Sequence, residues 1–163
     1  MIDKLDFLVR FWELKARHAT LGQPLGASEQ VELLSLMQLV MGEFDVPAAG
    51  PVERPKSALP AQLIGDGTML AVEIRALSAG ALIVASGASM AQGAHVIVRA
   101  TDAVSGVEYA LPCNVVWVHP GTSHEPCTMA LVVDGIPTRS VFATTDVPMP
   151  TSLGIGQKAR LVG

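Results

Sequence analysis

The fold is decided by the stretch Val72-Glu73-Ile74-Arg75-Ala76-Leu77-Ser78-Ala79-Gly80-Ala81-Leu82-Ile83-Val84. Val72 and Ile74 alternate with charged residues, which is the period-two pattern of a half-buried strand, and an apolar run resumes at Leu82. The pattern predicts two strands joined by a tight turn. Small residues at 78–81 let one backbone pass close to another backbone or to a ligand, and Gly80 can adopt the positive φ that some turns demand.

Further short strands are predicted on both sides of this stretch. Upstream, residues 58–64 form a strand that ends in the turn Gly65-Asp66-Gly67, where Asp-Gly is a strong hairpin signal. Downstream, strands are predicted at 95–100, at 107–118 with a bulge at Pro112, and at 127–133. Six or seven short strands at regular turn spacing indicate a closed or nearly closed barrel.

Two helices are predicted before the strands. Residues 3–18 place Leu5, Leu8, Val9 and Trp12 on one stripe of an amphipathic helix. Ser28 is the predicted N-cap of a second helix that runs to about residue 42 or 44. The second helix is apolar around most of its circumference, so we expect it to be buried on more than one face. One neighbour would be the first helix, and the other either the barrel or a second copy of the protein.

The composition of the chain suggests where its parts divide. Residues 46–57 are rich in Pro, Ala and Gly, which suits an extended connection. We therefore expect an N-terminal helical hairpin at 1–45, a linker at 46–57, a barrel at 58–143 and a C-terminal tail at 144–163. Within the tail, residues 159–162 could add an edge strand.

Charge and hydrophobicity limit the classes of function. Of the 163 residues, 50% are hydrophobic and 16% are charged, so the chain predicts a globular protein with an aliphatic core. The net charge of −4 argues against nucleic acid as a partner, because nucleic-acid affinity comes mostly from neutralising phosphates. No apolar run is long enough to span a membrane and no signal peptide is visible, so we expect a cytoplasmic protein without membrane insertion.

The order of these elements resembles a PilZ domain, the small β-barrel module best known as a receptor for cyclic di-GMP. The resemblance covers roughly residues 54–141: a strand, a turn containing Ser78, a strand beginning with Leu82, then Val115-Val116-Trp117 and a final strand at 129–133. It implies a mainly β fold with α, namely a six-stranded antiparallel PilZ-like β-barrel preceded by the N-terminal helical hairpin.

The family's ligand motif is incomplete in this sequence. PilZ receptors carry an Arg-x-x-x-Arg element before the first strand and an Asp/Asn-x-Ser-x-x-Gly turn. Here Arg54 and Lys56 precede the first strand without a second Arg at the required spacing, and Ala76 and Ala81 replace the acidic residue and the glycine of the turn. Each charge-assisted contact is worth roughly 1.5 to 3 kcal/mol, so losing several of them would raise a micromolar dissociation constant above the millimolar range. We expect no useful cyclic di-GMP binding. The alternative is a weak site formed by Arg54, Lys56, Arg75 and Ser78.

No catalytic or metal-binding motif is recognisable, so we expect no enzyme, no catalytic residue, no metal and no cofactor. Cys113, His119, His124 and Cys127 are possible zinc ligands by type, but their spacing does not match a zinc knuckle. Two buried thiols and two loop imidazoles are the preferred interpretation. A nucleophile and base formed by Ser78 and His95 has no support in the local sequence.

The sequence therefore predicts a non-enzymatic PilZ-like regulatory or scaffolding protein that binds other proteins. The resemblance implies bacterial signalling, with motility or polarity among its contexts. The N-terminal helices are the predicted partner or homo-oligomer interface, and the aromatic side chains of Phe7, Phe11 and Trp12 are its predicted anchors. A cyclic di-GMP receptor with an altered site is the first alternative, and a small barrel enzyme or metal-binding protein is the second.

Overall fold

The computed structural model describes residues 1–20, 22 and 24–141. It has two helices, α1 (Ile2–Ala19) and α2 (Ala27–Leu39), followed by strands. The strands are β1 (Leu59–Gly65), β2 (Thr68–Leu77), β3 (Leu82–Ser86), β4 (His95–Asp102), β5 (Val107–His119), β6 (Cys127–Val133) and β7 (Thr138–Val141). The tail predicted at 144–163, with its edge strand at 159–162, lies outside the described residues.

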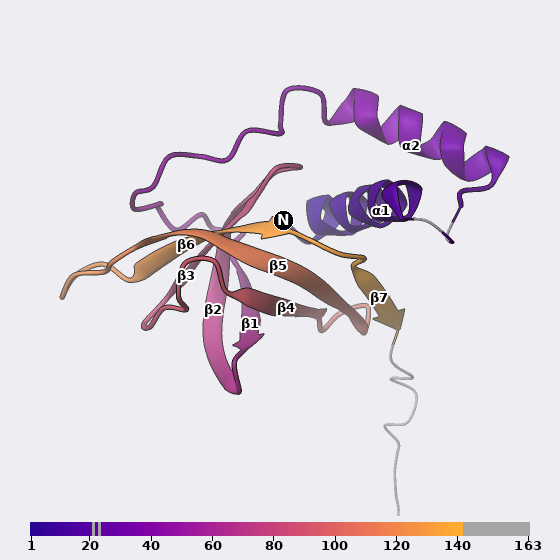
Figure 1. Ribbon diagram of the computed structural model, residues 1–163. Helices are drawn as coiled ribbons and strands as arrows, with labels where there is room; N and C mark the ends of the chain where they lie inside the picture. Colours follow the sequence, from indigo (N-terminus) through magenta and orange to yellow (C-terminus); the bar gives the residue numbers. More distant parts are fainter. Residues whose placement is uncertain (21, 23, 142–163) are drawn as a thin grey trace, which may run out of the picture.

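Strands β1 to β6 close into an antiparallel barrel (Figure 1). The order around the barrel is β1-β2-β3-β6-β5-β4, and β4 pairs back with β1. Closure leaves none of these six strands as a free edge along its whole length. The predicted fold class is confirmed: the protein is mainly β with α, a six-stranded antiparallel barrel preceded by a helical hairpin.

The first hairpin of the barrel follows directly from two adjacent residues. Gly65 pairs with Thr68, so Asp66 and Gly67 form a two-residue loop, and their φ angles are 48° and 71°. Positive φ at both positions is the geometry of a type I′ turn, which matches the twist of the strands it joins. The Asp-Gly prediction is confirmed.

The strands from β5 onward differ from the prediction in two ways. β5 runs without interruption past Pro112, which lies in register opposite Ile97, so the bulge predicted at Pro112 is wrong. The irregularity lies instead at Val116, where the register with β6 shifts between Val115 and Trp117. β7 was not predicted at all. It pairs with the first part of β5, outside the six-stranded barrel.

α1 belongs to the core of the barrel. Its predicted stripe of Leu5, Leu8, Val9 and Trp12 is buried, and these side chains join a single hydrophobic cluster with barrel residues such as Ile74. Figure 1 shows α1 lying between α2 and the strands. The helical segment and the barrel therefore share one interior.

α2 contacts its own chain along one side only. Leu33 is 6% exposed, whereas Val31 and Leu34 are each 63% exposed, so the expectation that this helix is buried on more than one face is wrong. α1 is the only helix or strand that packs extensively on it among the described residues. The predicted N-cap is also wrong: the helix begins at Ala27 after the N-cap Gly26, whose N–H donates to Glu29 Oε1 at 3.1 Å.

No helix among residues 1–20 and 24–141 is both long enough and apolar enough to cross a membrane.

Candidate functional site

An extended segment, residues 43–52, lies across the outside of the barrel, and we call it the strap. The strap is bound through its carbonyl oxygens, which accept four hydrogen bonds from β2, the β2–β3 turn, β5 and β6. The pairs are Gly80 N with Glu43 O (2.9 Å), Trp117 Nε1 with Pro47 O (2.8 Å), Thr128 Oγ1 with Gly50 O (2.8 Å) and Arg75 Nη1 with Val52 O (2.8 Å). In these four bonds the strap is always the acceptor, and the barrel and its β2–β3 turn supply the donors.

The strap approaches the barrel most closely at Gly80. A Cβ on this glycine would lie 2.2 Å from the carbonyl oxygen of Phe44, a distance that no side chain tolerates. The predicted close approach of two backbones at residues 78–81 is therefore present. Gly80 is not among the glycines with positive φ, so close approach, and not an unusual turn conformation, is what requires glycine here.

β3 and the first five residues of β6 are buried on their outer as well as their inner face. All five residues of β3 are buried, including Ile83 and Ala85, which alternate with the side chains that join the barrel core. Ala85 pairs with Thr128, the residue that donates to Gly50 of the strap. The strap thus lies over the outer face of β3 and β6. Beside the β2–β3 turn a cavity of about 410 Å³ remains, lined by Ala79, Gly80 and the strap residue Phe44.

The two arginines of the predicted nucleotide site, Arg54 and Arg75, meet at one carboxylate. Arg54 Nε lies 2.7 Å from Glu73 Oε2, and Arg75 Nε lies 3.1 Å from Glu73 Oε1. Hydrogen bonding from Arg54 holds the pKa of Glu73 below its usual range, so the carboxylate stays ionised. The chain itself therefore supplies the anion that these guanidinium groups contact.

The other two predicted residues do not complete a site. Ser78 is used within its own turn: its N–H donates to Ala81 O at 3.0 Å, and its hydroxyl oxygen accepts from Ala81 N at 3.3 Å. Lys56 is exposed in the turn that precedes β1. A cavity of about 320 Å³ lies beside Arg75, but Glu53 and Glu125 line it, and their negative charge opposes binding of a phosphate.

Neither thiol lies in a metal-binding cluster within the described residues. Cys113 and Cys127 are both buried free thiols, on β5 and β6. Burial raises the pKa of Cys113 to about 12, so this thiol stays protonated and unreactive at neutral pH.

The predicted partner anchors lie mostly inside the protein. Phe11 is fully buried and Trp12 is 5% exposed, with Trp12 Nε1 donating to Ala79 O at 2.9 Å, while Phe7 is partly buried against the core. Their role as anchors stays a prediction. The exposed apolar surface lies elsewhere: among the described residues, seven of the twelve exposed large hydrophobic side chains fall between positions 31 and 46.

This apolar surface includes a groove of about 520 Å³ between α1, α2 and the strap, which we call the helical groove. Leu34, Met37 and Phe44 line it with exposures of 63%, 44% and 42%, above the buried ring of Phe11. Lys15 stands at its rim, with Nζ 5.3 Å from the centre of the Phe44 ring. The groove therefore combines an apolar floor with a cationic edge.

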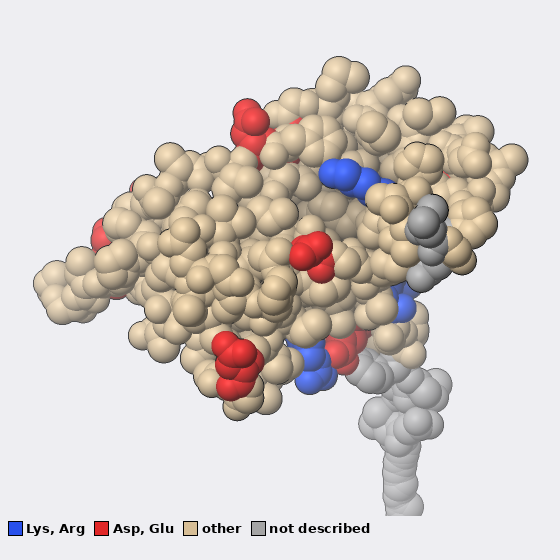
Figure 2. Space-filling model, in the orientation of Figure 1, with Lys and Arg blue, Asp and Glu red and all other residues tan. Residues whose placement is uncertain are grey.

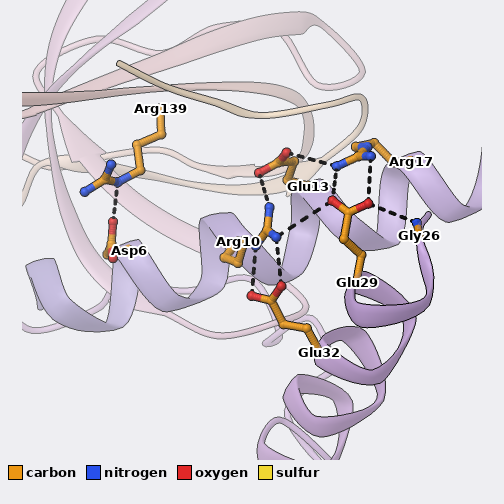
Figure 3. A network of polar contacts seen from close by, with 8 residues as sticks. All are labelled: Asp6, Arg10, Glu13, Arg17, Gly26, Glu29, Glu32 and Arg139. Carbon is orange, nitrogen blue, oxygen red and sulfur yellow. Dashed lines mark hydrogen bonds and ion pairs between the residues drawn. The ribbon is translucent and has the colours of Figure 1, made fainter. Parts of the chain in front are cut away.

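Ion pairs fix α2 in the position that forms this groove (Figure 3). Arg10 donates to both oxygens of Glu32, at 2.9 and 2.7 Å, and Arg17 donates to both oxygens of Glu29, at 2.7 and 3.2 Å. Glu13 on α1 links the two arginines, at 3.3 Å from Arg10 and 3.6 Å from Arg17. Bidentate pairs of this kind set the orientation of one helix on the other.

Acid is expected to loosen this helix pair. Hydrogen bonding from Arg10 lowers the pKa of Glu32, so its contribution to stability is complete above the unfolded-state pKa and is lost as the pH falls through the folded-state pKa. We expect Glu32→Gln to be less stable than the wild type at neutral pH and to lose less stability from about pH 5 downward. Urea denaturation at a series of pH values measures both effects. Glu125→Gln, in an exposed loop, is the control, and equal pH slopes for Glu32→Gln and the wild type would contradict the prediction.

Comparisons with known proteins give one structural likeness. No protein-family model matches the sequence, and no curated protein matches it. Among solved structures, the chain is similar to the YcgR-N domain of YcgR from Escherichia coli, with 18% identity and a TM-score of 0.35 over 50% of this chain and 76% of that chain. At this TM-score the likeness supports no statement about function.

Proposed function

We propose that this chain is a PilZ-like, non-enzymatic regulatory or scaffolding protein of the bacterial cytoplasm, which acts by binding another protein and does not bind cyclic di-GMP. The PilZ assignment rests on the resemblance of the sequence around Ser78 and Trp117, and the closed six-stranded barrel is consistent with it. Signalling, with motility or polarity control as its setting, is the context that the resemblance implies.

The helical groove is the observation that carries the proposal. An apolar groove beside two helices suits an amphipathic segment of a partner, which would place its apolar side chains against Leu34, Met37 and Phe44. Lys15 at the rim favours a segment with acidic residues beside the apolar ones. The proposed partner is therefore a protein that presents an apolar helix with acidic flanks.

The contacts of Arg54 and Arg75 support the absence of nucleotide binding. A phosphate would have to compete with Glu73 for both arginines and with the carbonyl oxygen of Val52 for Arg75. Both costs come in addition to the missing second arginine.

The first test measures protein binding. Full-length protein is used to capture partners from its source organism, and any partner is then purified and titrated. We expect Met37→Glu to weaken the purified complex by at least about 100-fold, since it places a charge in the apolar groove. Met69→Glu, the same change at an exposed position of β2, is the control. A complex that tolerates Met37→Glu as well as Met69→Glu would refute the groove as the partner site.

The second test is calorimetric titration with cyclic di-GMP. We expect no saturable heat at micromolar nucleotide with the wild type. Saturable heat that disappears in Arg54→Ala would establish the alternative, a receptor with an altered site.

A further inference from the structure

The strap lies on the barrel as a bound peptide would. Its main-chain oxygens accept hydrogen bonds of 2.8 to 2.9 Å from four donors, which are Arg75 Nη1, Gly80 N, Trp117 Nε1 and Thr128 Oγ1. We call these four donors, together with the outer faces of β3 and β6, the strap site. Donors that bond only to main-chain oxygens recognise an extended backbone and leave the choice of side chains open.

The strap site is apolar at its centre. Ile83 of β3 pairs in register with Ala130 of β6, and these residues are 1% and 0% exposed. Neither belongs to the hydrophobic cluster that fills the barrel. If the strap moved away, this pair would be exposed to water, which is unfavourable for apolar surface. The strap site therefore favours an occupant, and in this structure the occupant is the strap.

The strap itself buries little of its own surface. Seven of its ten residues are exposed, and the other three are partly buried. Segments with few buried apolar contacts and exposed hydrogen bonds open locally at a small cost in free energy. The strap can therefore leave the strap site while the six-stranded barrel stays closed.

The strap also leaves space unfilled at both ends of the strap site. The cavity of about 410 Å³ beside Gly80 is lined on the strap side by Phe44 and Val46. At the other end, the cavity of about 320 Å³ is lined by Val52 of the strap and by Glu125 of the barrel. A segment with larger side chains at these two places would bury more surface than the strap does.

Charge distinguishes the two cavities. Apolar residues line most of the first, whereas Glu53 and Glu125 line the second, and Arg75 in the second is already paired with Glu73. Figure 2 shows acidic groups and no Lys or Arg over the left part of the view, where the strap approaches the loop between β5 and β6. A large apolar side chain therefore suits the first cavity, and a basic side chain suits the second.

We propose that the strap site binds an extended, proline-containing segment of a partner protein, which takes the place of the strap. In the direction of the strap, this segment carries a large apolar side chain at the position of Val46 and a basic side chain at the position of Glu53. Proline suits the segment because a proline-rich chain is already extended and loses little entropy on binding. The inference goes beyond the proposed function, and none of the four donors lines the helical groove.

Calorimetric titration of the full-length protein with two synthetic peptides tests the binding. The first peptide has the sequence of residues 43–53, and the second carries Val46→Phe and Glu53→Arg. The first competes with a tethered copy of itself at a millimolar effective concentration, so we expect a dissociation constant above about 1 mM. The second fills the first cavity and faces Glu125 in the second, so we expect it to bind at least about 10-fold more tightly, near 100 μM. If the second peptide gave no saturable heat up to about 1 mM, the strap site would not be a peptide site.

A spin label on the strap shows whether the second peptide takes its place. Ala48→Cys provides an exposed thiol for the label, whereas the native thiols of Cys113 and Cys127 are buried. We expect the label at position 48 to become more mobile as the peptide saturates the protein. A label at Val104→Cys is the control, because Val104 is 98% exposed in the turn between β4 and β5. Saturable binding that leaves the label at position 48 unchanged would place the peptide on another surface and overturn the exchange.

A weakened strap gives a third measurement, since two segments that compete for one site are linked. Pro47→Gly and Pro51→Gly each make the open strap more flexible and favour it by a factor of about 2 to 5. We therefore expect the double variant to bind the second peptide roughly 4- to 30-fold more tightly than the wild type does. Equal affinities of the two proteins would contradict competition between the peptide and the strap.

Met37→Glu separates this inference from the proposed function. Met37 lines the helical groove, so its replacement should leave peptide binding unchanged. Loss of peptide binding in Met37→Glu would place the peptide in the helical groove and refute the strap site. A protein that binds no peptide but loses its partner through Met37→Glu would leave the proposed function standing. A protein that exchanges its strap but tolerates Met37→Glu in its partner complex would do the reverse.

Discussion

Replacing Trp12 with alanine is expected to lower the free energy of unfolding by about 3 to 5 kcal/mol. The indole is 5% exposed within the common core of α1 and the barrel, and its N–H donates to Ala79 O in the β2–β3 turn. The substitution leaves a large cavity and an unsatisfied carbonyl group. Urea denaturation followed by far-ultraviolet circular dichroism measures the loss without depending on tryptophan fluorescence.

Trp12→Phe is the matched variant, since it keeps a six-membered aromatic ring in the core and removes the donor with the smaller part of the indole. Its expected cost is about 1 to 3 kcal/mol, the range for leaving a buried acceptor unpaired. The same variant tests whether Trp12 contributes to a partner interface, because it should remain folded. If Trp12→Ala were as stable as Trp12→Phe, α1 would not be an integral part of the core.

Replacing Gly80 with alanine is expected to force the strap away from the β2–β3 turn. The added methyl group would meet the Phe44 carbonyl oxygen at 2.2 Å, so either the strap or the turn must move. We expect a loss of about 1 to 3 kcal/mol, which is typical of overpacking, together with loss of the hydrogen bond from Gly80 N to Glu43 O.

Trp117 reports on the strap directly, because its Nε1 donates to Pro47 O. In a Trp12→Phe background, Gly80→Ala is expected to shift the emission of Trp117 to longer wavelength as the strap leaves. Gly87→Ala is the control, since a Cβ at Gly87 would meet no atom within 4 Å and its φ is not positive. Unchanged emission and stability in Gly80→Ala would show that the strap does not depend on this contact.

Local patterns in the sequence were sufficient to predict most of the fold. The alternation of Val72 and Ile74, the Asp66-Gly67 pair and the stripe along α1 each depend on neighbours within a few residues, and each prediction agrees with the structure. β7 could not be predicted in this way. Its four residues are all exposed, and the strand exists because it pairs with Val107–Ala110, about thirty residues earlier.

The candidate site was less predictable than the fold. The apolar composition of α2 signals that it needs neighbours, but it does not say whether those neighbours are in the same chain, and the structure leaves Val31 and Leu34 exposed. The strap was recognisable as an extended segment. Its bonds to Trp117 and Thr128 join residues that are 70 and 78 positions apart, and no local pattern encodes such contacts.

All four barrel bonds to the strap end on main-chain carbonyl oxygens, which every amino acid possesses. The path of residues 43–52 therefore depends more on the donors of the barrel and its β2–β3 turn, at positions 75, 80, 117 and 128, than on the side chains of the strap. Over evolutionary time the side chains of Ala48 and Ala49 could be exchanged freely while the course of the segment is retained. The same tolerance makes these two exposed positions suitable for grafting a recognition peptide or a probe.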